Sequence, residues 1–192
     1  MTSYKLCCLK LQEGNIANRK MKVLIAEDDE DIAEYTYKLA LEKRGHQVTI
    51  TNNGQDCLNV YHKELENVTL YTDVSKRMKP FDAVILDYKM PKINGLEVAK
   101  EILAVNSHQR IIFASAYVKE TLVDSIKELN QIVELLQKPF GQEELIDVIE
   151  DKEIYSQLQK LNINIDDIKA ANFRHEQLRG VLDILKRLNK KK

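Results

Sequence analysis

Apolar and polar residues follow two alternating spacings along residues 22–149. Short, mostly apolar runs, typical of strands buried in a sheet, lie at 22–26, 47–51, 82–86, 110–115 and 132–136. After each run, apolar residues recur at the helical spacing of one buried face. These faces are formed by Ile32, Tyr35, Thr36, Leu39 and Ala40; Leu58, Tyr61, His62 and Leu65; Leu96, Ala99, Ile102 and Leu103; Leu122, Val123, Ile126 and Leu129; and Leu145, Ile146, Val148 and Ile149. Five alternating strand–helix units predict an α/β fold with a doubly wound parallel sheet.

Two stretches depart from this alternation. Residues 67–80 are mostly polar and end in Pro80. This connection is longer than the usual two to about six residues, and is either a helix extension or a surface loop. Residues 1–20 show no periodicity, and the apolar run 6–9 is too short for a signal-peptide core, so we expect a disordered or loosely attached extension. Because a strand begins directly after Met21, that methionine is a candidate for the natural start.

Residues 151–192 predict a small helical extension that follows a main domain at residues 21–150. A short apolar face is formed by Ile154, Leu158 and Leu161, and a longer one by Leu178, Val181, Leu182, Leu185 and Leu188. Residues 162–167 are typical of a turn, so two or three helices result. The extension is too short for a winged-helix domain and has no helix-turn-helix pattern with a turn glycine. These helices could pack on the main domain, form a homodimer or bind a partner.

Composition and charge narrow the class of protein. Apolar residues are 44% and charged residues 31% of the 192, and no apolar run approaches the roughly 20 residues of a membrane helix. We therefore expect a soluble protein with no membrane partner. Residues 1–20 carry +3 and residues 151–192 carry +4, so the overall net charge of −1 leaves −8 for residues 21–150. An acidic main domain argues against nucleic-acid binding there, although the basic C-terminal helices keep a DNA-binding output open.

Cysteines and histidines show no metal-binding or disulfide pattern. The three cysteines, Cys7, Cys8 and Cys57, have no CxxC spacing. They indicate neither a disulfide framework nor a zinc site, and they fit a reducing, cytoplasmic location best. We expect Cys57 to be a small buried apolar residue. The scattered histidines are interpreted as structural or solvated; they are His46, His62, His108 and His175.

Charged and hydroxyl side chains gather where four of the predicted strands end. Those side chains are Glu27, Asp28 and Asp29 after the first strand, Asp87 after the third, Ser115 at the end of the fourth and Lys138 after the fifth. In the strand order 2-1-3-4-5, strands one and three flank the crevice where such sheets bind ligands. Clustered carboxylates repel one another unless a cation intervenes, and a site of oxygen ligands suits Mg²⁺. With a hydroxyl and a lysine beside them, these carboxylates predict a site for a phosphoryl group on the Asp87 carboxylate.

Residues 21–150 resemble the receiver domain of response regulators in two-component signalling. The resemblance rests on four short motifs in the expected order at the strand ends. They are Glu27-Asp28, the run from Asp87 to Gly95 (DYKMPKING), Ser115-Ala116 and Lys138-Pro139-Phe140. The family implies a flavodoxin-like sheet and a phosphorelay role, with a sensor histidine kinase or a phosphotransfer protein as the partner.

The resemblance also implies roles for single residues. Asp87 is the phosphoacceptor, and Ser115 and Lys138 contact the phosphoryl group. Mg²⁺ is bound by Asp28, by Asp87, by the backbone carbonyl of Lys89, and by Glu27 directly or through water. Asp29 then becomes the helix cap rather than a metal ligand. The Lys138–Pro139 peptide bond is expected to be cis.

One position departs from the family pattern. Leu135 stands where the family usually has an aromatic residue that moves inward on phosphorylation, and Tyr117 is the nearest aromatic that could replace it. We expect a response regulator that switches a protein-interaction surface and is not an enzyme. The alternatives are a DNA-binding regulator, a pseudo-receiver that only binds partners, and an aspartyl-phosphate phosphatase. The last of these typically has a second acid two residues after the nucleophile, where this chain has Lys89.

Overall fold

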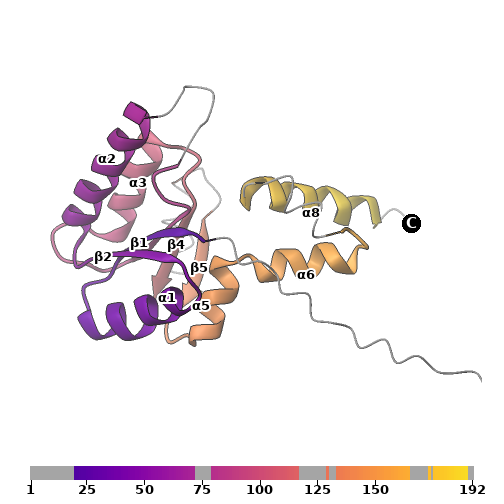
Figure 1. Ribbon diagram of the computed structural model, residues 1–192, viewed down its shortest axis with the longest axis horizontal. Helices are drawn as coiled ribbons and strands as arrows, with labels where there is room; N and C mark the ends of the chain where they lie inside the picture. Colours follow the sequence, from indigo (N-terminus) through magenta and orange to yellow (C-terminus); the bar gives the residue numbers. More distant parts are fainter. Residues whose placement is uncertain are drawn as a thin grey trace, which may run out of the picture.

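The computed structural model describes residues 20–71, 79–116, 129, 133–164, 173 and 175–189. Its centre is a five-stranded parallel sheet with the strand order β2-β1-β3-β4-β5 (Figure 1). The strands are β1 (Lys22–Ala26), β2 (Gln47–Thr51), β3 (Ala83–Asp87), β4 (Ile111–Ser115) and β5 (Glu134–Gln137). The predicted doubly wound sheet of order 2-1-3-4-5 is confirmed, and every predicted strand lies within two residues of its place.

Helices cover both faces of the sheet (Figure 1). The described helices are the π-helical segment η1 (Ile32–Lys38), α1 (Leu39–Lys43), α2 (Gly54–Tyr71), α3 (Gly95–Val105), α5 (Gln142–Ile149) and, beside the sheet, α6 (Lys152–Lys160) and α8 (His175–Asn189). Helices α2 and α3 pack on one face, and η1, α1 and α5 pack on the other. The connection at 67–80 begins as an extension of α2 as far as Tyr71. The predicted helix face at 122–126, Tyr117 and the extension at 1–19 lie outside the described residues.

Strand register explains both the core and the position of the site. Alternate residues of each strand face opposite layers, so Val23 and Ile25 pack with α1 and α5 while Leu24 and Ala26 pack with α2 and α3. Ala26 of β1 pairs with Leu86 of β3. The strands therefore end together, and the residues that follow them meet at one edge of the sheet.

The predicted inner face of the first helix is confirmed at Ala40, which is buried, and is wrong at Tyr35 and Leu39. Tyr35 and Leu39 are 67% and 42% exposed. The buried stripe is instead Ala33, Tyr37, Ala40 and Leu41. This second stripe also has helical spacing, and Tyr37, Ala40 and Leu41 pack in the core layer beneath the sheet. Ile32 still packs partly against the core.

The C-terminal helices α6 and α8 lie side by side and project to one side of the sheet (Figure 1). They share a small core formed by Ile154, Leu158, Leu178 and Leu182. Two helices and their predicted faces are confirmed, except that Leu188 is 61% exposed. Among the described helices, none combines the length and the apolar character that crossing a membrane requires.

Candidate functional site

Three acidic side chains meet at the carboxyl ends of β1 and β3. Carboxylate oxygens of Glu27, Asp28 and Asp87 all lie within 4.8 Å of one another. Glu27 is buried, Asp87 is partly exposed and Asp28 is exposed, so the cluster opens to solvent on the Asp28 side. The sheet thus brings together the three acids that the sequence placed in one site.

Lys138 joins two of these acids. Its Nζ lies 2.6 Å from Glu27 Oε2 and 2.9 Å from Asp87 Oδ2. Burial alone would lower the pKa of Lys138, but the bonds to Glu27 and Asp87 raise it above its ordinary value. Burial raises the pKa of Glu27, an effect that Lys138 partly offsets. A lysine ammonium is therefore held against the Asp87 carboxylate.

The turn after β5 fixes the lysine backbone. The Lys138–Pro139 peptide bond is cis, as the resemblance implied. The Lys138 N–H donates to the carbonyl oxygen of Ser115 at 2.8 Å. Ser115 is itself buried as the last residue of β4, where it pairs in register with Gln137. The structure thus places Ser115 and Lys138 side by side at the edge of the sheet where β3 ends in Asp87.

Hydrogen bonds and a close backbone approach fix the loop that follows β3 and Asp87. The Lys89 N–H donates to Asp87 Oδ1 at 3.3 Å, and the Gly95 N–H donates to the Tyr88 carbonyl at 3.1 Å. A Cβ on Gly95 would lie 2.1 Å from the Asp87 carbonyl oxygen, so only glycine fits there. Asn94 caps α3 by accepting from the Glu97 N–H at 3.0 Å. Local sequence therefore fixes the loop that presents Asp87.

Gly54 is a supporting residue that the sequence indicated only as a turn former. It begins α2, and a Cβ there would lie 2.1 Å from the carbonyl oxygen of Ile93. Its missing side chain lets the loop after β3 pack on the start of α2. No motif in the sequence pairs these two positions, which lie far apart along the chain.

Asp29 is a helix cap. Its Oδ1 accepts from the backbone N–H groups of Asp31 at 3.0 Å and Ile32 at 3.1 Å. This oxygen satisfies donors at the helix start that would otherwise lack partners. The interpretation of Asp29 as a cap is confirmed.

Tyr37 is a neighbour of the site that the sequence analysis missed. It is fully buried on η1, and its ring packs against that of Phe140 with the centroids 5.5 Å apart. Burial raises the pKa of its phenol, and the charges of Glu27 and Asp87 raise it further. The hydroxyl interacts with the Glu27 carboxylate, although among the described residues no group lies in well-aligned hydrogen-bonding geometry with it. The stripe that contains Tyr37, with Ala33, Ala40 and Leu41, has helical spacing, as does the predicted stripe that contains Tyr35. Spacing alone therefore does not distinguish the two.

Leu135, the departure from the family pattern, lies on β5 beside Phe113 of β4. It packs partly buried against the core layer of α2 and α3. The structure therefore shows an aliphatic side chain on the inner side of this strand.

The donor set of the acidic cluster fits a hard divalent cation. It offers carboxylate oxygens only, from Glu27, Asp28 and Asp87. Mg²⁺ prefers oxygen ligands and keeps several waters, and the exposed side of the cluster leaves room for them. Lys138 supplies a second positive group on the buried side, where an anion bound to Asp87 would be paired.

Comparisons with known proteins agree with this geometry. The profile of the family described as "Response regulator receiver domain" matches residues 23–150. The response regulator receiver protein CpdR of Brucella abortus is 27% identical over 129 residues, which cover 67% of this chain and 93% of that protein. Sporulation initiation phosphotransferase F of Bacillus subtilis is 27% identical over 132 residues, covering 67% and 90%.

Solved structures show the same fold. The Borrelia burgdorferi structure titled as the CheX-CheY-BeF3-Mg+2 complex matches with a TM-score of 0.53 at 22% identity, covering 66% of this chain and 84% of that one. Its sheet and helices are thus similar to those of residues 21–150. Since the family profile spans two thirds of the sequence and the site residues stand at the expected strand ends, the chain belongs to the family of response regulator receiver domains.

Proposed function

We propose that this protein is a response regulator whose Asp87 accepts a phosphoryl group from a sensor histidine kinase or a phosphotransfer protein. The observation that carries the proposal is the position of Lys138, whose Nζ lies 2.9 Å from Asp87 Oδ2 inside an acidic cluster. A lysine held there can pair with a phosphoryl group on that carboxylate. The Bacillus subtilis relative is itself named a phosphotransferase, which supports this class of chemistry.

The transfer step needs few protein groups. A carboxylate oxygen of Asp87 attacks phosphorus, the bond from phosphorus to the donor histidine nitrogen breaks, and that nitrogen keeps the electron pair. Lys138 and the Ser115 hydroxyl then bind phosphoryl oxygens. When bound by Glu27, Asp28, Asp87 and the Lys89 carbonyl, Mg²⁺ would neutralise charge on the same oxygens. The Borrelia structure, which contains beryllofluoride and magnesium by its title, supports this assignment.

The wider assignment has three parts. Residues 21–150 form the receiver, residues 151–192 form a C-terminal extension, and the protein acts as a switch rather than as an enzyme that turns over substrates. The cysteine usage supports a cytoplasmic location. The phosphatase alternative is disfavoured because Lys89, two residues after Asp87, offers no second acid.

The test is covalent labelling of the full chain. Acetyl phosphate with Mg²⁺ should label wild-type protein at Asp87, as read by mass spectrometry of the intact chain and its peptides. Asp87→Asn should lose the label, whereas Asp183→Asn, the same change on the exposed side of α8, should keep it. Undiminished labelling of Asp87→Asn, or labelling of wild type that persists after Mg²⁺ is chelated, would contradict the proposal.

A further inference from the structure

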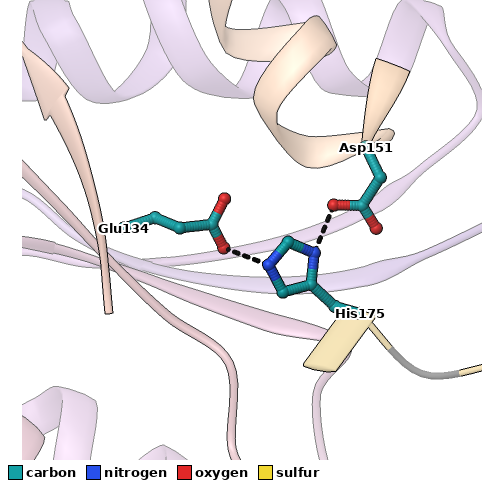
Figure 2. A group of neighbouring side chains, drawn as sticks. All are labelled: Glu134, Asp151 and His175. Atoms are coloured by element: carbon teal, nitrogen blue, oxygen red, sulfur yellow. Dashed lines mark hydrogen bonds and ion pairs between the residues drawn. The ribbon is translucent and has the colours of Figure 1, made fainter. Parts of the chain in front are cut away.

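A network of four charged residues joins the C-terminal helices to the receiver. Glu134 begins β5, Asp151 stands just before α6, and His175 begins α8. Figure 2 shows the His175 ring between the two carboxylates, with one ring nitrogen facing each. Nε2 lies 3.0 Å from Glu134 Oε1, and Nδ1 contacts Asp151 Oδ1. One imidazole therefore ties α8 to β5 and to the start of α6.

Arg110 completes the network from the receiver side. Its Nε lies 2.8 Å from Glu134 Oε1, and its Nη2 lies 3.0 Å from Asp151 Oδ1. It also donates to the carbonyl oxygens of Val148 and Ile149 at the end of α5. The guanidinium is almost fully buried, and the carboxylate side chains of Glu134 and Asp151 are only 12% and 11% exposed.

The two carboxylates that flank His175 favour its protonated form. Two carboxylates and one guanidinium leave a net charge of −1, which an imidazolium cancels; Arg179 of α8 lies 3.3 Å from Glu134 at the more exposed rim. Burial would lower the pKa of His175, but Asp151 and Glu134 raise it above 6.5. Burial would likewise raise the pKa of Glu134, but His175 and Arg110 hold it well below 4.5.

The same residues do not form a metal site. The two ring nitrogens of His175 face different carboxylates, so a single ion cannot take both acids and the imidazole without turning the ring (Figure 2). The guanidinium of Arg110 already lies against both acids. Its positive charge opposes a cation there, so the group acts as an ion-pair network.

The network is connected to the phosphoacceptor site by two short strands. Arg110 directly precedes β4, which ends in Ser115, and Glu134 begins β5, which is followed by Lys138. Each strand thus has a network residue at one end and a proposed phosphoryl ligand at the other. Lys138 now contacts Glu27 and Asp87. A phosphoryl group would draw Lys138 and Ser115 toward itself and shift both strands relative to α8.

We propose that the α6–α8 pair is the output element of this protein, docked on the receiver by His175 and released when Asp87 is phosphorylated. The proposal rests on the proposed function, because the phosphoryl group supplies the force on β4 and β5. Separating the partners of a buried ion pair costs free energy, because a charged group that loses its partner there is not hydrated by water instead. Small strand shifts are therefore enough to favour an undocked α8.

Hydrogen–deuterium exchange of the full chain, read by mass spectrometry, tests this proposal. With Mg²⁺ and beryllofluoride, amides of α8 should exchange about tenfold faster or more, while those of α3 change little. Asp87→Asn should show no such response. His175→Gln should show fast exchange in α8 without beryllofluoride, whereas His62→Gln on α2 should match wild type.

A pH series of the wild-type chain provides a second measurement that needs no variant. The groups facing His175 are Glu134, Asp151, Arg110 and, at the rim, Arg179. The pKa of His175 is raised in the docked state. Its contribution to the stability of docking is therefore complete below about pH 6.5 and is lost as the pH rises through the raised pKa. Amide exchange in α8, corrected for the intrinsic pH dependence of exchange, should become faster as the pH rises through that pKa. A corrected exchange rate that does not change with pH would overturn the role of His175.

Fluorine NMR of bound beryllofluoride separates failure of the inference from failure of the proposed function. If beryllofluoride binds wild type through Asp87 and leaves α8 exchange unchanged, the output role is overturned while the receiver function stands. If beryllofluoride does not bind in the presence of Mg²⁺, the proposed function fails and the inference fails with it. Slow exchange of α8 in a folded His175→Gln chain would also overturn the docking role.

Discussion

Glu134 and Lys138 stand at opposite ends of one strand, Glu134 as the first residue of β5 and Lys138 directly after its last. Glu134 contacts His175 of α8, and Lys138 contacts Asp87. The strand β5 has four residues, so Glu134 and Lys138 lie roughly 13 Å apart along it at the usual rise of about 3.3 Å per residue. This strand is the element through which we propose that phosphorylation of Asp87 acts on the position of the C-terminal helices.

Removing Lys138 should change metal binding and stability in opposite directions. In Lys138→Ala the Glu27 and Asp87 carboxylates lose their cation. Without metal, unfolding in urea should show a loss of about 1–3 kcal/mol, because the pair is only partly screened by solvent. Mg²⁺ affinity, measured by titration calorimetry, should rise about tenfold, since a competing positive charge is gone.

Lys186→Ala is the matched control for this change. Lys186 is exposed in the last turn of α8, so its removal should alter neither quantity by more than about 0.5 kcal/mol. Weaker Mg²⁺ binding in Lys138→Ala would show that the lysine positions the carboxylates for the ion rather than competing with it.

Gly95 should tolerate no side chain. Gly95→Ala would place a Cβ 2.1 Å from the Asp87 carbonyl oxygen, so the loop or α3 must shift. We expect a loss of about 1–3 kcal/mol in urea unfolding, with weaker beryllofluoride binding because Asp87 moves with its backbone. Gly180→Ala, in the middle of α8 with no heavy atom near the added Cβ, should instead stabilise that helix by about 0.5–1 kcal/mol. Equal effects of the two substitutions would contradict the close approach at Gly95.

The sequence predicted the sheet and the gathering of charged residues at its edge better than it predicted helix faces and long-range ion pairs. Asp28, Asp87 and Lys138 were recoverable because each follows a short apolar run, and parallel strands bring their ends together. The inner face of the first helix could not be predicted reliably, because Tyr35 and Tyr37 belong to two different stripes that both fit helical spacing. His175 was interpreted only as structural or solvated, since no local pattern joins it to Glu134. That contact depends on how α8 packs on α6.

Arg110 and Arg44 should differ sharply in their contribution to the free energy of unfolding. Arg110→Met leaves Glu134 and Asp151 as buried carboxylates with one partner fewer, which should cost about 3–5 kcal/mol in urea unfolding. Arg44 also pairs with a carboxylate, that of Glu150, but its side chain is 43% exposed. Arg44→Met should therefore cost about 0–1 kcal/mol. Similar losses for both variants would contradict the central place of Arg110 in the network.

Tyr37→Phe and Tyr61→Phe should differ in their effect on stability, although both phenols are buried. The Tyr61 hydroxyl donates to Gln109 Oε1 and accepts from Asn106 Nδ2, each at 3.0 Å. Its removal leaves polar groups without a partner and should cost about 1–2 kcal/mol.

Removing the Tyr37 hydroxyl should instead be neutral or stabilise the fold by up to about 1 kcal/mol. Its interaction with the Glu27 carboxylate lacks well-aligned hydrogen-bonding geometry, so its burial is only weakly compensated. Urea unfolding of both variants without metal provides the measurement. A loss in Tyr37→Phe as large as that in Tyr61→Phe would mean that the hydroxyl donates to Glu27 in solution. Tyr37 would then belong to the groups that orient the acidic cluster around Asp87.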